Sequence, residues 1–275
     1  MSYERFTERL RSLFRENLPR YIGTTDETMG DKIMSDGTPA GDLDNYMLKV
    51  LRAVISENFP SDYTIGEEDR KSEEQIQRFL SCQDCCQWTI DGLDGTGNRS
   101  LGTNSYGAMV SRRLGPDILF AAVFRPIDEA LRKDGFYYAE LDEGAWQWRG
   151  KHKQYHRLRT AQAGELNRVV VMLEGSSKKF YHPPLTELGK ILTTRPGFSS
   201  CIAATTVARG KASALVAIDN KPWDNWPALL LIKEAGGIIT DWQGNPCAPQ
   251  NCGTIVAAAN KADHELILSI TRRAK

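Results

Sequence analysis

Apolar residues at helical spacing dominate the first sixty positions. In the first twenty residues they recur every three to four positions and predict an amphipathic helix: Phe6, Leu10, Leu13, Phe14 and Leu18. A second apolar stripe runs from Leu43 to Ile55, with Asp42 in front of it as a helix N-cap and Pro60 near its end. Two long helices are therefore expected before residue 60.

Short apolar runs replace the helical pattern after residue 60. The expected strands are 63–66, 87–91, 105–112, 118–125, 135–140 and 145–149, with a helix over 73–80. Turn sequences at 114–117 and 133–135 join neighbouring strands as hairpins, so this sheet should be largely antiparallel. We expect residues 1–150 to form an N-terminal α+β subdomain.

The second half alternates between strand and helix. Strands are expected at 168–173, 212–218, 237–241 and 254–259, and helices from 184, from 199, over 225–235 and from 262. Such alternation is typical of a sheet covered by helices on both faces. Residues 151–275 are therefore expected to form a C-terminal α/β subdomain.

The charge composition argues against nucleic acid and anionic membranes as binding partners. The chain has 275 residues, 41% of them hydrophobic, and 35 basic residues balance 35 acidic ones. With no net charge and no basic run, nothing favours nucleic acid or an anionic membrane. The N-terminal segment does not have the apolar run of a signal peptide, and no segment is long enough to span a membrane, so a cytoplasmic protein is expected.

The six cysteines are unevenly distributed. Cys82, Cys85 and Cys86 lie together, whereas Cys201, Cys247 and Cys252 are scattered. Cys82-x-x-Cys85 with Cys247 and Cys252 would offer four thiolates to zinc, but the second spacing is irregular and no histidine is near. Reduced, partly buried thiols are the expected state in a cytosolic protein.

Candidate chemistry centres on residues 88–98, where an apolar strand leads into a turn with Asp91 and Asp94. Asp-Gly pairs are common in ordinary turns, so two consecutive turns without chemistry are one interpretation. A dinucleotide fingerprint is a weaker one, because Ser100 occupies the third glycine position. The third is a cation site, since two adjacent carboxylates repel unless protonated or bridged by a metal ion.

Two other acidic positions favour the cation site among these interpretations. Glu67 follows the strand 63–66, and Asp224 lies where the helix 225–235 is expected to begin. Each has an ordinary explanation, Glu67 as part of a polar segment before the helix 73–80 and Asp224 as a helix cap. Together with Asp91 and Asp94 they would supply the oxygen ligands of a magnesium-dependent phosphatase.

In these motifs the chain resembles the inositol monophosphatase family, the magnesium-dependent, lithium-sensitive sugar phosphatases. The resemblance rests on three segments in family order: Ile65-Gly66-Glu67-Glu68, Trp88 to Thr96, and Trp223-Asp224 followed, after nine intervening residues, by Glu234-Ala235-Gly236-Gly237. It implies a layered αβαβα sandwich, α+β and α/β in character, of the inositol monophosphatase and fructose-1,6-bisphosphatase type.

The resemblance also implies roles for single residues. The metal ligands for two or three Mg²⁺ would be Glu67, Asp91, Asp94, Asp224 and the carbonyl oxygen of Leu93. Thr96 and Glu67 would orient the attacking water. The backbone amides of Gly95 and Thr96 would bind the phosphate. Catalysis would thus rest on Glu67, Thr96 and Asp91, with water attacking phosphorus directly and no phosphoenzyme forming.

Other positions match the family pattern less well. Asp42 is either a support for a third metal ion or a plain helix N-cap, because the segment before it is two residues shorter than usual and lacks the threonine that the family pattern places after the proline. Ala217 stands where many members carry a glutamate that binds substrate hydroxyls, and Asp219 is a possible substitute. Arg99 is expected at the surface or a sheet edge, with a second anion contact as the alternative. The expected substrate-binding positions are Ser176, Ser199, Ser200, Ala217 and Asp219.

The leading hypothesis is a Mg²⁺-dependent phosphomonoesterase that acts on a small phosphorylated polyol, sugar or related metabolite. Its substrate could be inositol phosphate, histidinol phosphate, a 3'-phosphoadenosine nucleotide, fructose bisphosphate or NADP. The alternative is a regulatory binding protein that keeps the fold with weak or no catalysis. The resemblance also favours a homodimer and inhibition by lithium.

Overall fold

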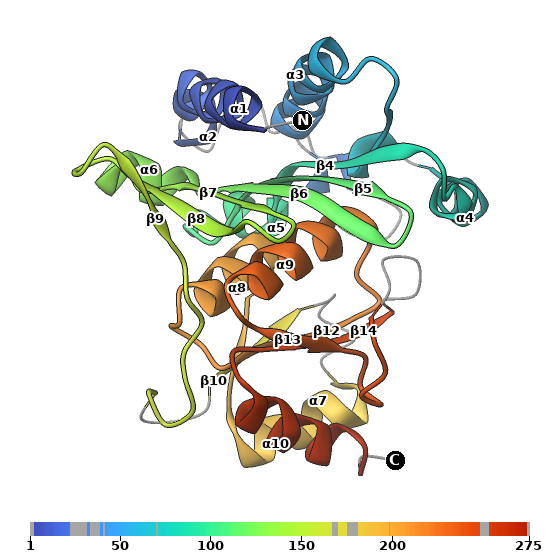
Figure 1. The fold of residues 1–275 in the computed structure, drawn as a ribbon, viewed down its shortest axis with the longest axis vertical. Helices are drawn as coiled ribbons and strands as arrows, with labels where there is room; N and C mark the ends of the chain where they lie inside the picture. Colours follow the sequence, from blue (N-terminus) through green and yellow to red (C-terminus); the bar gives the residue numbers. More distant parts are fainter. Residues whose placement is uncertain are drawn as a thin grey trace.

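Helical and sheet layers alternate through the molecule (Figure 1). The computed structural model describes residues 3–22, 32–33, 39–40, 42–69, 71–166, 170–174, 181–197, 199–247 and 253–273. From the top of Figure 1 downward, outer helices, a first sheet, middle helices, a second sheet and further outer helices follow one another. This is the αβαβα architecture that the resemblance implied.

The upper helices bury one face each against the first sheet. They are α1 (Glu4–Glu16), α2 (Leu18–Ile22) and α3 (Asp42–Asn58). Phe14 of α1 stacks on Phe124 of the sheet with ring centroids 4.7 Å apart, and Leu51 of α3 is fully buried. The single helix expected over the first twenty residues is interrupted at Asn17, just before Leu18-Pro19, because proline has no amide hydrogen for a continuing helix.

The first sheet has seven strands in sequential order, β3 to β9. Only β3 and β4 run parallel, and every other neighbouring pair is antiparallel, as the hairpin sequences predicted. The strands are β3 (Tyr63–Gly66), β4 (Cys86–Asp94), β5 (Gly107–Leu114), β6 (Asp117–Phe124), β7 (Phe136–Glu140), β8 (Gly144–Arg149) and β9 (Gln154–Arg157).

Short elements punctuate this sheet. Besides the two-stranded sheet of β1 (Lys32–Ile33) and β2 (Pro39–Ala40), they are the 3-10 turn η1 (Glu67–Asp69), α4 (Glu73–Ser81), α5 (Thr96–Ser100) and α6 (Pro126–Arg132). The hydrophobic pattern predicted α4 but not α5 or α6, which are too short to show a helical period.

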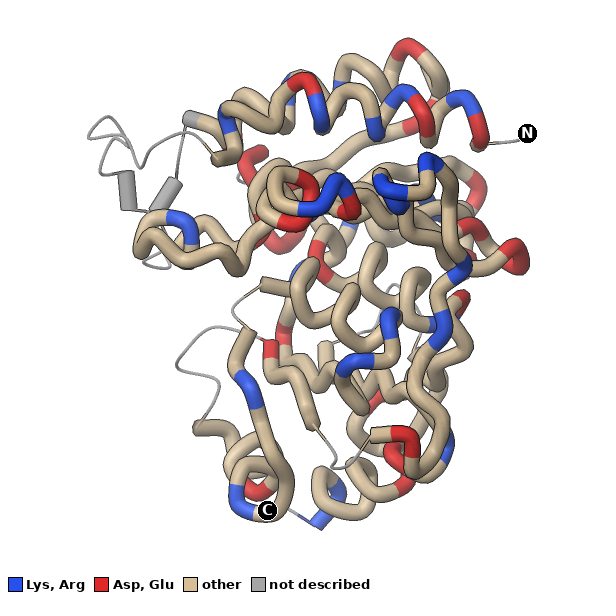
Figure 2. The backbone as a smooth tube through the Cα atoms, turned by 90° about the vertical axis from the view of Figure 1, so that its left-hand side faces the viewer, with Lys and Arg blue, Asp and Glu red and all other residues tan. Residues whose placement is uncertain are grey.

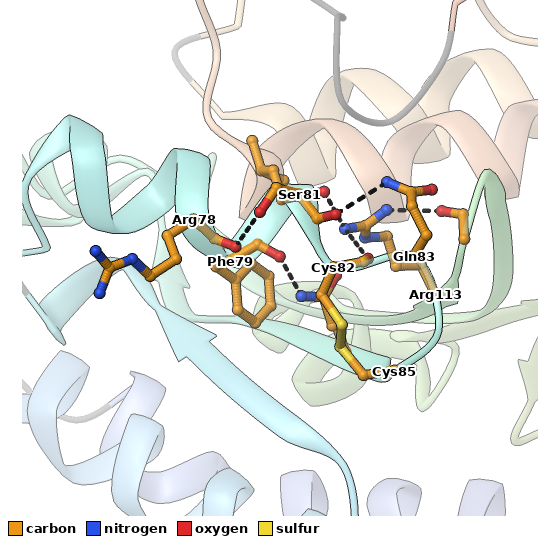
Figure 3. The surroundings of a disulfide bond; sticks show 10 residues. Arg78, Phe79, Ser81, Cys82, Gln83, Cys85 and Arg113 are labelled. Atoms are coloured by element: carbon orange, nitrogen blue, oxygen red, sulfur yellow. Dashed lines mark hydrogen bonds between the residues drawn. A yellow bond between two sulfur atoms is a disulfide. The ribbon is translucent and has the colours of Figure 1, made fainter.

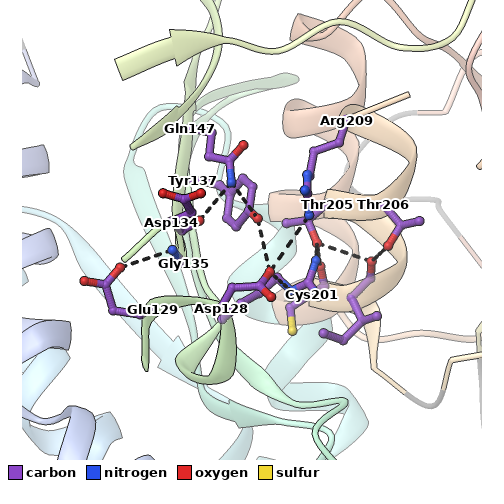
Figure 4. A network of polar contacts seen from close by, with 12 residues as sticks. Asp128, Glu129, Asp134, Gly135, Tyr137, Gln147, Cys201, Thr205, Thr206 and Arg209 are labelled. Carbon is purple, nitrogen blue, oxygen red and sulfur yellow. Dashed lines mark hydrogen bonds and ion pairs between the residues drawn. The ribbon is translucent and has the colours of Figure 1, made fainter. Parts of the chain in front are cut away.

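The middle layer consists of α8 (Ser200–Ala208) and α9 (Pro222–Glu234), which separate the two sheets. A polar network joins α8 to α6, which follows β6 of the first sheet (Figure 4): Arg125, the N-cap of α6, donates from Nη1 to Thr205 Oγ1 at 3.2 Å, and Arg209 lies 3.9 Å from Asp128. Because α9 is apolar on all sides, it is buried between the sheets, with Trp226 fully enclosed.

The second sheet has the order β11-β10-β12-β14-β13 and mixes parallel and antiparallel pairs. Its outer face packs on α7 (Pro183–Ile191) and α10 (Lys261–Thr271), so helices cover both faces as expected. Its strands are β10 (Val170–Glu174), β11 (Thr193–Pro196), β12 (Ala214–Ile218), β13 (Ile238–Thr240) and β14 (Thr254–Ala258).

The expectation of reduced thiols is wrong for part of the cysteine cluster. Cys82 and Cys85 form a disulfide just before β4, with their Cα atoms 5.9 Å apart (Figure 3). The turn after α4 brings the two residues within the distance that a disulfide requires. The spacing Cys82-x-x-Cys85 alone does not determine this distance. Cys247 is disulfide-bonded as well, whereas Cys86 and Cys201 are free thiols. The oxidised cysteines offer no thiolate to zinc.

Surface charge follows the balanced composition. In Figure 2, basic and acidic positions alternate over the visible face, without a large region of one sign. Within the described residues, no helix combines the length and the apolar character that a bilayer crossing requires.

Candidate metal centre

Three carboxylates converge at the end of β4. Asp91, Asp94 and Asp224 each offer an oxygen, and these oxygens lie within 4.8 Å of one another. Asp91 and Asp94 are 2% and 6% exposed, and Asp224 is half-buried. The expectation that the two acids of the turn meet a distant third acid is therefore met in space.

A β-bulge brings Asp91 and Asp94 together. Residues three apart on a regular strand point to opposite faces of a sheet. Here Asp91 pairs with Met109 and Asp94 with Gly107, so β4 has one residue more than β5 between the two pairs. The extra residue turns Asp94 back toward Asp91, which is how bulges redirect side chains next to active sites.

The start of α8 fixes the Asp94 carboxylate. Ser199 Oγ donates to it at 2.6 Å, and the backbone amides of Ser200 and Cys201 donate at 3.1 and 2.7 Å. These bonds satisfy free amides at a helix N-terminus and place the negative charge at the positive end of the helix. Ser199 and Ser200, expected in the substrate pocket, thus contact a candidate metal ligand.

Asp224 comes from the first turn of α9. Its Oδ2 accepts a hydrogen bond from the Lys221 backbone amide at 3.1 Å, so the same side chain caps the helix and faces the other two acids. The capping and metal-ligand interpretations of Asp224 are therefore compatible.

Thr96 lies between two acceptors directly after this turn. Its hydroxyl is 2.8 Å from the carbonyl oxygen of Leu93 and 3.4 Å from Oδ2 of Asp44. Gly95 precedes it with φ 83°, a left-handed conformation that a glycine adopts without strain. The contacts of Thr96 therefore connect the end of the turn to Leu93 and to Asp44 of α3.

Asp44 is the residue that sequence reasoning missed. It belongs to α3, is 2% exposed, and contributes to raising the pKa values of Glu67 and Asp91. The only sequence signal was an acid two positions after Asp42 on a helix that buries its apolar stripe. The side chain of Asp42 lies outside the described residues, so its role stays a prediction.

Repulsion among the acids dominates the electrostatics of the site. Burial raises the pKa values of Glu67 and Asp91 well above the ordinary range, and neighbouring carboxylates raise them further. Burial also raises the pKa of Asp94, against the lowering effect of its bonds to Ser199 and Cys201. These carboxylates are suited to a hard divalent cation, since all the donors are oxygens and a cation would relieve the repulsion.

The remaining expected residues are spread around this centre. Ala217 is buried on β12, and Asp219 is exposed after it with φ 51°. Ser176 lies outside the described residues. Arg99 is buried, contrary to the surface or sheet-edge position expected for it, and it donates to the backbone carbonyls of Tyr21 and Arg20 at 3.2 and 3.3 Å.

Comparison with known proteins gives one family and several relatives. A family model described as the inositol monophosphatase family matches residues 7–275. A protein named histidinol-phosphatase from Chlorobaculum parvum is 26% identical over 235 residues, which is 86% of this chain and 84% of that protein. A protein named Nus factor SuhB from Salmonella typhimurium is 27% identical over 202 residues, 71% of this chain and 70% of that protein.

Solved structures share the whole fold. An IMPase from Thermotoga maritima superposes with a TM-score of 0.77 at 21% identity, covering 99% of this chain and 98% of its own. An IMPase/NADP phosphatase described as complexed with Mg²⁺ and phosphate gives 0.75 at 16% identity, covering 97% and 95%. At this level of identity the likeness concerns the fold alone.

Proposed function

The chain belongs to the inositol monophosphatase family, and from this premise we propose that it is a Mg²⁺-dependent phosphomonoesterase for small phosphorylated metabolites. One observation carries the proposal: carboxylates from β4 and α9 converge within 4.8 Å, and burial together with the neighbouring carboxylates raises the pKa of Asp91 well above its ordinary value, a repulsion that a cation would relieve. The names of the relatives support phosphate-ester hydrolysis and give several alcohols as candidates.

We assign the metal ligands as the sequence motifs suggested. Glu67, Asp91, Asp94, Asp224 and the Leu93 carbonyl oxygen would hold two or three Mg²⁺. Bound there, the cations would lower the pKa of water and stabilise the leaving oxygen. Three hydrogen bonds from the start of α8 hold the Asp94 carboxylate in position for this role.

The residues of the turn would orient the reactants. The Thr96 hydroxyl donates to the Leu93 carbonyl oxygen at 2.8 Å and lies 3.4 Å from Asp44 Oδ2. With that carbonyl oxygen engaged by a cation, the hydroxyl would donate to Asp44 instead and accept a proton from the attacking water, which Glu67 would hold from the other side. The backbone amides of Gly95 and Thr96 would bind the phosphate oxygens. In this arrangement Asp44 keeps the threonine hydroxyl correctly directed.

A regulatory binding protein is the second candidate. It is favoured by the relative that is named as a Nus factor, so the fold alone does not decide between catalysis and binding. Lithium inhibition and a homodimer belong to the phosphatase proposal and come from family resemblance. A cytoplasmic location also belongs to it and comes from the sequence pattern.

Phosphate release from a panel of phosphomonoesters, with and without Mg²⁺, tests the proposal. We expect wild type to release phosphate only with Mg²⁺, and Asp91→Asn to lose turnover by several orders of magnitude. The matched control is Asp117→Asn, which changes an exposed aspartate at the start of β6 and should retain wild-type rates. A wild type that releases no phosphate from any ester would favour the binding protein.

A further inference from the structure

Glu174 is a buried acid that the proposed chemistry does not use. It is the last residue of β10 and is 2% exposed. Its Oε1 is buried and has no hydrogen-bond partner within the described part of the chain. A carboxyl oxygen withdrawn from water without a partner is costly, so its retention needs an explanation.

The sheet register places Glu174 beside Ala217. β10 and β12 run parallel, and Glu174 pairs with Ala217. Paired residues on adjacent strands point to the same face of a sheet, and the strands lie about 4.8 Å apart. Met172 and Leu215, two residues earlier on each strand, face the core that contains α8 and α9. Glu174 and Ala217 therefore share the face that looks toward the candidate metal centre.

Electrostatic and backbone contacts tie Glu174 to this centre. Asp94 and Asp224 both contribute to raising its pKa, after burial, which shows that its carboxyl group lies near theirs. The Ser199 backbone amide acts on it in the opposite direction. A Cβ on Gly197 would overlap Oε1, so the carboxyl group packs directly on the backbone that leads to Ser199.

We propose that Glu174 determines substrate specificity: its carboxyl oxygen accepts a hydrogen bond from a hydroxyl or ammonium group on the alcohol part of the phosphate ester. Ala217 stands where family resemblance places a substrate-binding glutamate, and Glu174 offers the same functional group from the neighbouring strand. The inference rests on the proposed phosphatase function and extends it to the alcohol that is recognised.

Kinetics with matched substrates test this assignment. Inositol 1-phosphate carries hydroxyl donors, histidinol phosphate carries an ammonium donor, and p-nitrophenyl phosphate has neither beside its ester. Glu174→Ala should lower kcat/KM on the order of 10- to 100-fold for at least one of the first two esters, the one whose donor the site accepts. The kcat/KM for p-nitrophenyl phosphate should stay within about threefold of the wild-type value. An equal loss on all three esters, or no loss on any, overturns the proposal.

Two further variants separate the kinds of donor. Glu174→Gln keeps an acceptor oxygen but removes the charge, so it should retain most activity if the donor is a hydroxyl and lose it if the donor is an ammonium group. Adding Ala217→Glu to Glu174→Ala should restore part of kcat/KM, because the carboxyl group returns on the adjacent strand. A double variant that is no better than Glu174→Ala argues against equivalent positions.

Binding of the product alcohols gives a readout without turnover. With Mg²⁺ and inorganic phosphate present, inositol or histidinol should raise the Tm of wild type and not that of Glu174→Ala, while phosphate alone stabilises both equally. If wild type releases no phosphate but this difference appears, the phosphatase proposal fails and the recognition by Glu174 stands. Equal stabilisation of both proteins, or no stabilisation of wild type by either alcohol, overturns the recognition.

Discussion

Replacing Asp91 by asparagine should stabilise the metal-free protein. The change removes one charge from a cluster whose oxygens lie within 4.8 Å, where two unit charges repel by about 3.5 kcal/mol at an effective dielectric constant of about 20. Two ionised neighbours would double this repulsion. Asp91 can instead stay protonated, which at pH 7.5 costs about 5 kcal/mol relative to its ordinary pKa of 3.8. The cost of the repulsion to the folded protein is therefore at most about 5 kcal/mol.

Part of this penalty is screened, because Asp224 is half-exposed. We therefore expect Asp91→Asn to raise the free energy of unfolding without metal by about 2–4 kcal/mol, or Tm by at least about 4 °C. Asparagine Oδ1 can still accept the bond that the Leu93 amide donates to Asp91 at 2.9 Å. The local turn should therefore survive the substitution.

Metal should reverse the order of stability. Mg²⁺ at one thousand times its Kd adds about 4.1 kcal/mol to wild type by mass action, which exceeds the advantage of the variant, and the variant should gain little. Differential scanning calorimetry measures the Tm of wild type and of Asp91→Asn, once in EDTA and once in Mg²⁺. Asp117→Asn is the control, whose Tm should equal that of wild type under both conditions. A lower Tm for Asp91→Asn than for wild type in EDTA at pH 7.5 would refute the reasoning.

The same cluster sets a pH dependence. Because the pKa of Asp91 is raised in the folded state, that state binds more protons than the unfolded chain, and stability falls as pH rises above about 4 toward the raised value. In EDTA, wild type should therefore lose stability between pH 5 and 8 more steeply than Asp91→Asn. A slope that the substitution leaves unchanged would assign the pH dependence to other groups.

Three further substitutions test the supports of the site. Ser199→Ala removes the hydroxyl that donates to Asp94 at 2.6 Å. In a titration of phosphate release with Mg²⁺, the variant should need a Mg²⁺ concentration about 10- to 100-fold higher for half-maximal activity. Thr96→Ala should lower kcat by about 10²-fold or more while Thr96→Ser keeps most of it, and equal losses in both would argue against a role for the hydroxyl. Gly107→Ala forces a methyl group onto a backbone oxygen of β6 and should lower unfolding free energy by about 2 kcal/mol or more, whereas Gly97→Ala, with open space around it, should change little in the same denaturant titration.

The sequence placed two acids of the candidate centre at strand ends, because each lies at the end of a short expected strand. Strand ends hold side chains at an edge of the sheet, so the hydrophobic pattern is enough to place Glu67 and Asp91 there. Asp94 needed more: only the bulge against β5 decides that it faces Asp91, and a bulge depends on pairing with a distant strand.

Residues that act through tertiary contacts escaped the sequence. Asp44 looks like any polar position on an amphipathic helix until α3 packs on β4 and brings it to Thr96. Glu174 looks like the end of a strand until its register with β12 is known. The disulfide between Cys82 and Cys85 depends on the turn after α4 in the same way.

The bonds from α8 to Asp94 have one more consequence. Asp91 and Asp94 belong to the first sheet, while Asp224 and the amides that hold Asp94 come from the middle helices in the second half of the chain. Neither half alone therefore contains all three carboxylates of the candidate centre. If Mg²⁺ binds there as proposed, its affinity would report how well the two halves have docked, and two separately produced fragments should recover Mg²⁺ binding only on mixing.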